Sequence, residues 1–307
     1  LVRFLDLLAG RTDQQLQRPL YEELLAVSAH LSPDGEENRD EQAEWRGRAW
    51  VPLARLSSAP EAGEVARRSA HAYRFCARLG DARATLELAR SLHRLADLRR
   101  LERPDEAYLA ALEGLDRLAS QDSAEALRTR AALAGIASDL TREADPTSAE
   151  QFARTAVLAS EARVEHADTP AYDDGLARAL IALGDARITS LRLASVAAYA
   201  AAVMASDTGD ARYPDDDRAG HYRSVALTRL ARSLRVAQPE DATGLLREAL
   251  VRVLARHEHR QQDPRLWFDL ASVLHNLACA ELHDDPMAAM GHWYESRAYA
   301  RLVLAAR

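Results

Sequence analysis

A short apolar motif that recurs six times constrains the fold of this chain more than any other feature of its sequence. In each copy, a large apolar residue is followed three positions later by a second apolar residue, and a small residue comes directly after it. The copies occupy residues 50–54, 92–96, 133–137, 180–184, 227–231 and 274–278. Their second apolar positions are 42, 41, 47, 47 and 47 residues apart. A nearly fixed period of this length is typical of a stacked array of helical repeats.

Each copy of the motif predicts the first helix of a helical hairpin. Residues three and four positions apart share one face of an α-helix, so the two large residues and the small residue form one packing stripe. The small residue lets the second helix of the hairpin approach closely. The six small residues are Ala54, Ala96, Ala137, Gly184, Ala231 and Ala278.

Proline marks the predicted start of the second helix in five of the six hairpins. These residues are Pro60, Pro104, Pro146, Pro239 and Pro286, and acidic residues lie beside them. Proline suits the first helical turn because its missing N–H needs no partner there, and nearby carboxylates complement the helix dipole. The fourth hairpin lacks this proline, and its turn is predicted at residues 189–192. Further loops are predicted at residues 167–174, 208–217 and 260–264.

The composition predicts an all-α fold class. Apolar residues make up 48% of the chain and charged residues 28%, which is typical of a folded protein. The helix formers Ala, Leu, Arg and Glu dominate, while glycine and proline number only 13 and 11. No run of about 18 uncharged apolar residues occurs, so no membrane-spanning segment is predicted. The net charge of −7 argues against a general nucleic-acid binder, because phosphate binding needs a basic face.

All 40 basic residues are arginine, and lysine is absent. This pattern indicates codon bias in a GC-rich genome, selection against modification of amines, or selection for guanidinium groups that recognise carboxylates. The two cysteines, Cys76 and Cys279, lie far apart at apolar helical positions, which favours buried free thiols in a reducing cytoplasm. The chain begins at Leu1 and not at Met, which indicates a piece of a longer protein.

Residues 42–307 resemble the tetratricopeptide repeat (TPR) family, whose unit is a pair of antiparallel helices. The copies at 50–54 and 180–184 match the Trp-x2-Leu-Gly part of its motif most closely. This chain differs from the family motif at the tyrosine position. The six copies have Ser57, Arg99, Leu140, Arg187, Leu234 and Glu281 there. The period also exceeds the usual 34 residues of the family. Resemblance to a neighbouring helical-repeat family is therefore the alternative interpretation.

The resemblance implies a right-handed α-solenoid of about six antiparallel helical hairpins. Residues 39–307 would form this TPR-like array, and residues 1–38 would form an N-terminal helical cap and a loop. A cap is expected because the terminal repeat of such an array otherwise exposes its apolar face.

The resemblance also implies a binding groove, because the first helices of tetratricopeptide repeats line a concave surface. The residues that flank the packing stripe would point into this groove. They are Arg48, Arg55, Arg90, His93, Asp97, Arg178, Asp185, Arg232 and His275. The five arginines predict charge-assisted hydrogen bonds to an acidic peptide, although they also fit a solvated helix face. The lysine-and-asparagine clamp with which the family binds C-terminal carboxylates is not matched here.

The predicted function is that of a non-enzymatic scaffold that binds a partner protein or peptide in a bacterial cytoplasm. The alternative is a sensory or regulatory part of a larger bacterial signalling protein, whose NTPase, protease or transcription-regulator domain lies outside this chain. No cofactor, metal, membrane or direct nucleic-acid partner is predicted, and self-association into a homo-oligomer stays open. The sequence contains no Gly-rich phosphate loop, HExxH motif or nucleophile elbow.

Two further patterns concern histidine and the aromatic residues. His257 and His259 resemble metal ligands, but residues two apart on a helix do not face each other, so no metal site is predicted there. The aromatic pairs at 267–268 and 293–294 indicate either core packing or an exposed docking patch.

Overall fold

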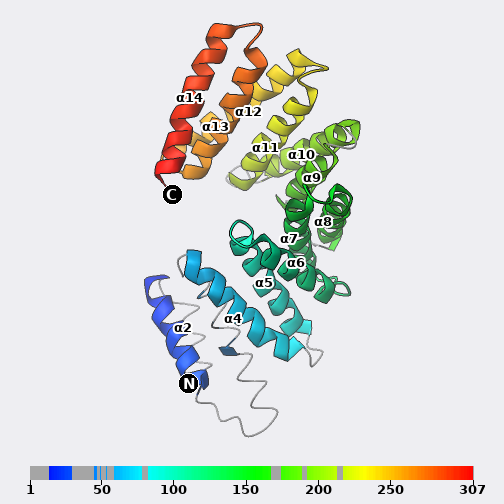
Figure 1. Ribbon diagram of the computed structural model, residues 1–307, viewed down its shortest axis with the longest axis vertical. Helices are drawn as coiled ribbons and strands as arrows, with labels where there is room; N and C mark the ends of the chain where they lie inside the picture. The colour runs from blue at the N-terminus through cyan, green and yellow to red at the C-terminus, as the bar shows by residue number, and fades with distance from the viewer. Residues whose placement is uncertain are drawn as a thin grey trace. The chain divides into compact units, whose positions relative to one another are not determined.

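The computed structural model describes residues 14–29, 45–46, 49, 53, 59–77, 82–166, 174–188, 192–212 and 217–306. Every regular element among these residues is an α-helix, so the predicted all-α fold class is confirmed (Figure 1). The chain divides into two compact units, Leu1–Thr141 (unit 1) and Arg142–Arg307 (unit 2). The predicted boundary between residues 38 and 39 lies outside the described residues. No described helix is long and apolar enough to cross a bilayer.

The described helices follow the predicted hairpin order. Unit 1 contains α2 (Gln14–Ala29), α4 (Ala59–Ala77), α5 (Ala82–Arg99), α6 (Pro104–Arg117) and α7 (Ala124–Thr141). Unit 2 contains α8 (Pro146–His166), α9 (Asp174–Arg187), α10 (Arg192–Arg212), α11 (Asp217–Leu234), α12 (Pro239–His259), α13 (Pro264–Glu281) and α14 (Pro286–Ala305). Five of the six motif copies lie in α5, α7, α9, α11 and α13, as predicted, and the first copy lies mostly outside the described residues.

Neighbouring helices pack on one another in sequence order, as expected of a solenoid. From α4 to α7 and from α8 to α14, each helix contacts the next helix along the chain. In addition α5 contacts α7, α9 contacts α11, and α11 contacts α13, whereas the described even-numbered helices form no comparable pairs. Because the odd-numbered helices lie closer together, they form the inner face of each unit.

The repeated motif supplies the core between these helices. Leu92, Leu95 and Ala96 of α5 are all buried, as are the corresponding motif residues of α13. The small position of the motif allows the closest approach at Gly184 of α9. A Cβ atom at this position would overlap the ring of Tyr199 on α10, which is itself fully buried. Glycine therefore permits the close packing of this hairpin.

The predicted proline positions are confirmed as helix starts. Pro104, Pro146, Pro239 and Pro286 are the first residues of α6, α8, α12 and α14, and Pro60 is the second residue of α4. The helix without this proline, α10, begins at Arg192, which is the last residue of the predicted turn. Residues 260–263 connect α12 to α13, as predicted, while the loop predicted at 167–174 lies almost entirely outside the described residues.

The loop predicted at residues 208–217 is wrong in its first half, because α10 continues to Arg212. The polar composition of this segment suggested a turn, but the Thr208 hydroxyl donates to the Met204 carbonyl at 3.1 Å. A threonine that bonds to the carbonyl four residues earlier can remain inside a helix. At the other end of the segment, α11 begins at Asp217.

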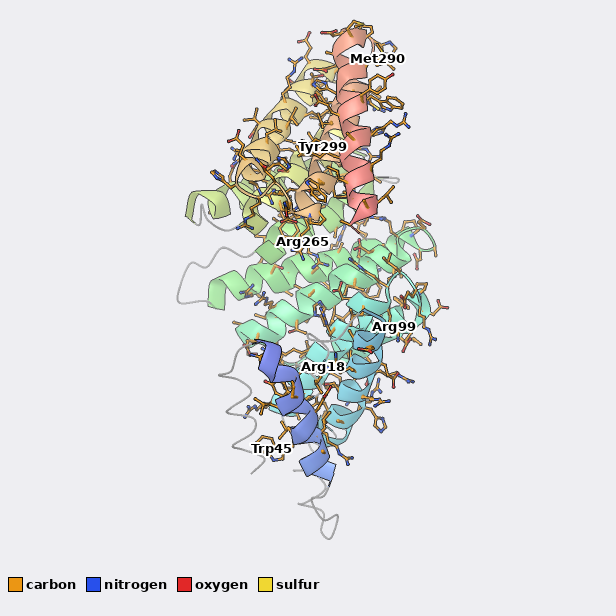
Figure 2. The ribbon with its side chains drawn as sticks, turned by 90° about the vertical axis from the view of Figure 1, so that its left-hand side faces the viewer. Arg18, Trp45, Arg99, Arg265, Met290 and Tyr299 are labelled. Atoms are coloured by element: carbon orange, nitrogen blue, oxygen red, sulfur yellow. The ribbon has the colours of Figure 1, made fainter. Side chains whose placement is uncertain are left out.

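The N-terminal helix α2 covers the beginning of the first repeat. One core cluster consists of Tyr21, Leu24, Ala49 and Leu53, with Leu20, Leu25 and Val65 packed against it. Arg18 on the surface of α2 forms ion pairs with Glu22 on the same helix and, at 3.7 Å, with Glu61 on α4 (Figure 2). The apolar and charged contacts together join α2 to the start of the helical stack.

The aromatic pairs near the C-terminal end are largely exposed. Phe268, Trp293 and Tyr294 all face solvent to a large extent, and only Trp267 is partly buried. The indole Nε1 of Trp267 donates to the Gln261 carbonyl at 2.8 Å. Of the two interpretations of these pairs, core packing is therefore wrong for three of the four residues.

Candidate functional site

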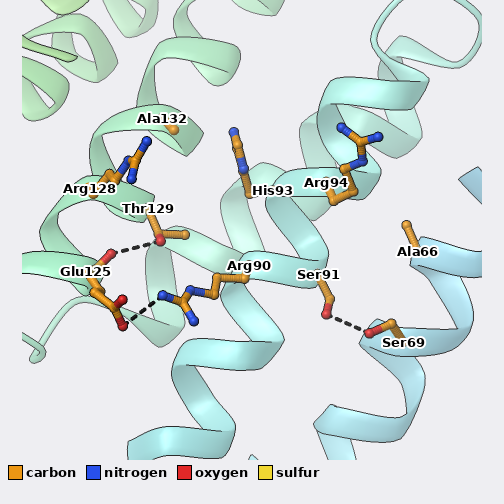
Figure 3. Close-up of a pocket in the computed structure, with 10 residues that line it drawn as sticks. All are labelled: Ala66, Ser69, Arg90, Ser91, His93, Arg94, Glu125, Arg128, Thr129 and Ala132. Carbon is orange, nitrogen blue, oxygen red and sulfur yellow. Dashed lines mark hydrogen bonds and ion pairs between the residues drawn. The ribbon is translucent and has the colours of Figure 1, made fainter. Parts of the chain in front are cut away.

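An arginine-lined cleft of about 430 Å³ lies among three helices of unit 1 (Figure 3). It is lined by Ala66 and Ser69 of α4, by Arg90, Ser91, His93 and Arg94 of α5, and by Glu125, Arg128, Thr129 and Ala132 of α7. A cleft of this volume is in the range of known ligand pockets. Most of its polar side chains come from the odd-numbered helices α5 and α7, which form the inner face of the unit.

Helical periodicity places these side chains on common faces. On α5, residues 90, 93 and 94 are three and four positions apart, and on α7 residues 125, 128, 129 and 132 repeat at the same spacing. Residues at this spacing lie on one side of a helix. The opposite side of α5 carries the buried residues Leu88, Leu92 and Leu95. The apolar stripe therefore orients the polar side chains towards the cleft.

Arg90 is held by two carboxylates. One Nη atom lies 2.6 Å from Glu87 on the same helix, and the other lies 2.7 Å from Glu125 on α7. Burial alone would lower the pKa of Arg90, but the charges of Glu87 and Glu125 and their hydrogen bonds raise it overall. Glu125 therefore links α5 to α7 and neutralises Arg90 within the cleft.

Arg94 and Arg128 have no such partners among the described residues. Neither guanidinium forms an ion pair or hydrogen bond with any of them, and the Nε atom of Arg94 is buried without a hydrogen-bond partner. Figure 3 shows the two side chains on either side of His93. A buried donor without an acceptor is unusual in a folded protein, because it loses its hydrogen bonds to water and gains none in return. The cleft thus presents positive charge and free donors.

Small hydroxyl groups line the cleft beside these arginines. Ser69 of α4 and Ser91 of α5 are buried and lie 2.8 Å apart between their Oγ atoms. The Thr129 hydroxyl donates to the Glu125 carbonyl at 2.9 Å within α7. These groups have partners inside the protein, so the donors that remain for a ligand belong to Arg94 and Arg128.

The structure brings only two of the predicted groove residues into this cleft. Arg90 and His93 line the cleft. Asp97 lies one turn further along α5, where its Oδ1 atom is 3.7 Å from Nε of Arg100. Arg48 and Arg55 lie outside the described residues. Arg178, Asp185, Arg232 and His275 belong to unit 2 and are not among the residues that line this cleft.

Asp185 has structural partners and is not a free groove residue. Its Oδ2 atom lies 3.2 Å from an Nη atom of Arg142, and its Oδ1 atom lies 3.4 Å from Nε of Arg229. Oδ1 also accepts a hydrogen bond of 2.6 Å from the Tyr199 hydroxyl. Burial raises the pKa of Tyr199 strongly, and the negative charge of Asp185 raises it further. Asp185 is only 12% exposed and joins the helices α9, α10 and α11.

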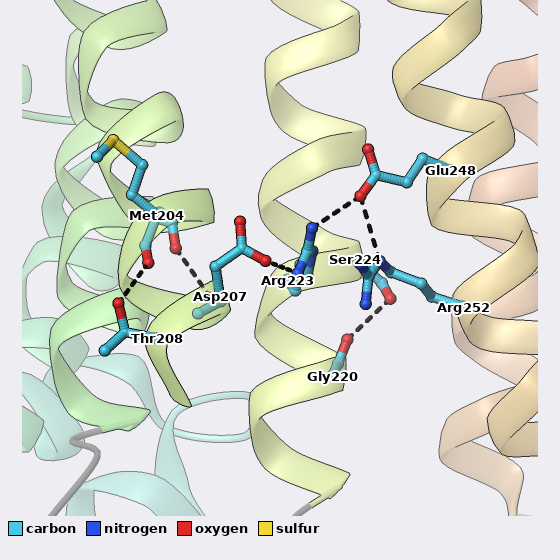
Figure 4. A network of polar contacts seen from close by, with 10 residues as sticks. Met204, Asp207, Thr208, Gly220, Arg223, Ser224, Glu248 and Arg252 are labelled. Carbon is cyan, nitrogen blue, oxygen red and sulfur yellow. Dashed lines mark hydrogen bonds and ion pairs between the residues drawn. The ribbon is translucent and has the colours of Figure 1, made fainter. Parts of the chain in front are cut away.

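Arg223 of unit 2 is largely buried and is also paired with carboxylates. Arg223 of α11 lies between Asp207 of α10 and Glu248 of α12, with an Nη atom 2.8 Å from Glu248 (Figure 4). Nε of Arg252 also lies 3.2 Å from Oε1 of Glu248. Burial, together with the charge of Arg252, lowers the pKa of Arg223. Arg94 and Arg128, in contrast, form no ion pair with a described carboxylate and line the same cleft, which makes the cleft of unit 1 the candidate site.

Three lining residues of the cleft, Arg94, Arg128 and Ser69, were not predicted from the sequence. The groove positions were counted at fixed offsets from the packing stripe, and none of these residues has such an offset. Arg94 could have been found because it is four residues after Arg90 and therefore lies on the same face of α5. Arg128 and Ser69 carried no comparable signal, since they reach the cleft through packing between helices.

The comparisons with known proteins give a fold but no family. No family model and no curated protein matches the sequence. Among solved structures, BtubC (BKLC) from P. vanneervenii is similar at a TM-score of 0.56 and 18% identity, over 81% of this chain and 92% of that chain. The apo form of RapI is similar at a TM-score of 0.59 and 12% identity, over 99% of each chain. The likeness shows the fold alone.

That likeness supports the helical-repeat architecture over nearly the whole chain. The narrower resemblance to the tetratricopeptide family stays a prediction. Among the described residues, no group of three or more His, Cys, Asp or Glu side chains is arranged to hold a metal ion. Cys279 of α13 is a free, partly buried thiol, and its Sγ lies 3.9 Å from Nε2 of His275.

Proposed function

We propose that this chain is a non-enzymatic binding protein that holds an acidic segment of a partner protein in the cleft of unit 1. The observation that carries the proposal is the pair of guanidinium groups, Arg94 and Arg128, that lack partners among the described residues. An arginine beside a carboxylate forms short, charge-assisted hydrogen bonds, often two at once. Five of the other eight lining residues are small or hydroxylated and leave room for the partner's side chains, namely Ala66, Ser69, Ser91, Thr129 and Ala132.

The position of the cleft supports a macromolecular partner. It lies on the inner face of a helical stack, and repeat arrays of this kind commonly bind extended segments along such a surface. The protein as a whole carries a net charge of −7, so a local surplus of arginine is a specific feature and not an average property. Acidic segments would be attracted to the cleft and repelled by much of the remaining surface.

Fluorescence anisotropy with a labelled acidic peptide, acetyl-Glu-Asp-Glu-Asp-Glu-amide, tests the proposal. We expect the Arg94→Gln/Arg128→Gln double variant to bind this peptide at least tenfold more weakly than the native chain. Arg235→Gln is the matched control, because Arg235 is an exposed turn residue of unit 2 and the substitution removes the same charge. Equal affinity of the native chain and the double variant would contradict the proposed site.

A further inference from the structure

We infer that Glu125 of α7 is an internal competitor of the partner segment, which displaces it from Arg90 of α5 when it enters the cleft. The inference rests on the proposed function, since it concerns how an acidic segment gains access to the same site. It makes Glu125 the residue that limits the affinity of the cleft for carboxylates.

The contact between Arg90 and Glu125 has the form that an acidic ligand would adopt. One Nη atom of Arg90 lies 2.7 Å from the Glu125 carboxylate, which comes from a different helix and lines the cleft (Figure 3). A carboxylate of a partner would bind a guanidinium group at about the same distance and with the same charge. Glu125 therefore occupies the place of a ligand carboxylate.

The two carboxylates on Arg90 differ in how easily a ligand can replace them. Glu87 is three residues before Arg90 on α5, its side chain is 23% exposed, and it is not among the lining residues. The side chain of Glu125 is 65% exposed and that of Arg90 is 36% exposed. Ion pairs with such exposure contribute little to stability, because water solvates both charges once they separate. The contact with Glu125 is therefore the one that a ligand can replace.

The position of Glu125 in its helix lowers the free-energy cost of this displacement. Glu125 lies in the first turn of α7, where an acidic side chain complements the helix dipole. Its carboxylate keeps this interaction and gains water after it leaves Arg90. The Thr129 hydroxyl donates to the main-chain carbonyl of Glu125 at 2.9 Å, so that hydrogen bond does not depend on the Glu125 side chain.

The balance of charge explains why the displacement matters for affinity. Three arginines line the cleft, namely Arg90, Arg94 and Arg128. Glu125 lines it as well, and Glu87 lies 2.6 Å from an Nη atom of Arg90. Among these five side chains one positive charge is in surplus, and an incoming anion meets the negative charge of Glu125. Neutralising Glu125 doubles the surplus and leaves one Nη atom of Arg90 to the ligand.

Fluorescence anisotropy with labelled acetyl-Glu-Asp-Glu-Asp-Glu-amide measures the competition. Glu125→Gln removes the negative charge and retains the size of the side chain. This variant should bind the peptide about three- to fivefold more tightly than the native chain, which is the scale of an exposed ion pair. Glu258→Gln is the matched control, because Glu258 is an exposed residue of α12 in unit 2 and the substitution removes the same charge. It should leave the affinity unchanged.

A double-mutant cycle shows whether Glu125 acts through Arg90. In an Arg90→Gln background, Glu125→Gln should no longer raise the affinity, because the guanidinium group for which the two carboxylates compete is gone. A general loss of negative charge would raise the affinity equally in both backgrounds, and a purely structural role of Glu125 would lower it in both. Circular dichroism melting curves of the four proteins establish that each variant is folded.

Different outcomes overturn different statements. If Arg94→Gln/Arg128→Gln weakens binding but Glu125→Gln gains nothing, the inference is wrong and the acidic-segment function stands. If the gain persists without Arg90, or if Glu258→Gln shows it as well, the competition for Arg90 is wrong. If neither the native chain nor Glu125→Gln binds the peptide, the proposed function is wrong and the inference falls with it. Binding by Glu125→Gln alone would support both statements.

Discussion

At the scale of single residues, arginine has two distinct roles in this chain. Most of the buried or half-buried arginines hold carboxylates between helices, as Arg74 does with Glu113 at 2.6 Å and Arg187 does with Glu150 at 2.9 Å. These carboxylates have lowered pKa values because the arginine hydrogen bonds stabilise their charged form. Arg94 and Arg128 lack such partners among the described residues. The same residue type therefore supports the fold at most positions and provides the candidate site at two.

Glycine likewise has a different role at each position, which a matched pair of substitutions can reveal. Gly184→Ala should lower the free energy of unfolding by about 1–3 kcal/mol, because the added methyl group overlaps the Tyr199 ring and overpacks the core. Gly135→Ala in α7 should raise it by about 0.5–1 kcal/mol, since nothing lies within 4 Å of the new Cβ and alanine favours the helix. Urea denaturation of both variants measures the difference. A stabilised Gly184→Ala variant would show that the α9–α10 contact is looser than described.

At the scale of helices, the sequence predicted packing much better than it predicted the site. Apolar spacing and the helix-starting prolines are local signals, so the motif located the odd-numbered helices and proline located four even-numbered helix starts. The cleft depends on pairing between helices. Asp185 was predicted in the groove, but its partner Arg142 is 43 residues away in sequence and removes it from any free surface. That Arg94 and Arg128 line one cleft follows only from the packing of α5 against α7, which no local sequence signal encodes.

The hydrogen bond between α9 and α10 predicts a pH dependence of stability. The pKa of Tyr199 is raised by burial and by Asp185, so the hydroxyl stays protonated in the folded state while the unfolded state titrates near pH 10. The stabilisation by the protonated Tyr199 hydroxyl is therefore fully present below about pH 10. Above this pH it is lost progressively, and at pH 11 the free energy of unfolding is lower by about 1.4 kcal/mol. The absence of lysine leaves this pH range free of ammonium titration.

Urea denaturation of the native chain and of Tyr199→Phe at pH 9 and pH 11 measures this loss. At pH 9 the variant should be less stable by about 1.5–3 kcal/mol, because it lacks a hydrogen bond to a charged group. Between the two pH values it should lose less stability than the native chain, since one buried hydroxyl no longer titrates on unfolding. An equal decrease in the free energy of unfolding between pH 9 and pH 11 in both proteins would contradict the role assigned to Tyr199.

At the scale of the whole molecule, stability is expected to be local. Each described helix contacts mainly its neighbours in sequence, and the chain divides into two compact units. In arrays of this kind, stability is approximately a sum of repeat and neighbour-interface terms, so a defect weakens its surroundings most. The candidate cleft lies in unit 1, and a substitution in the core of unit 2 should therefore leave it intact.

Leu246→Ala tests this locality. Leu246 of α12 is buried with Ala231, Ala242 and Leu277, so its truncation leaves a cavity between α11, α12 and α13 and costs about 2–5 kcal/mol. Hydrogen exchange measured by mass spectrometry should show faster exchange in these three helices and unchanged protection in α5 and α6. Val251→Ala, at an exposed position of α12, is the control and should alter neither region. Equal loss of protection in α5 and α6 would mean that the two units unfold as one cooperative body, and a defect in unit 2 would then weaken the cleft as well.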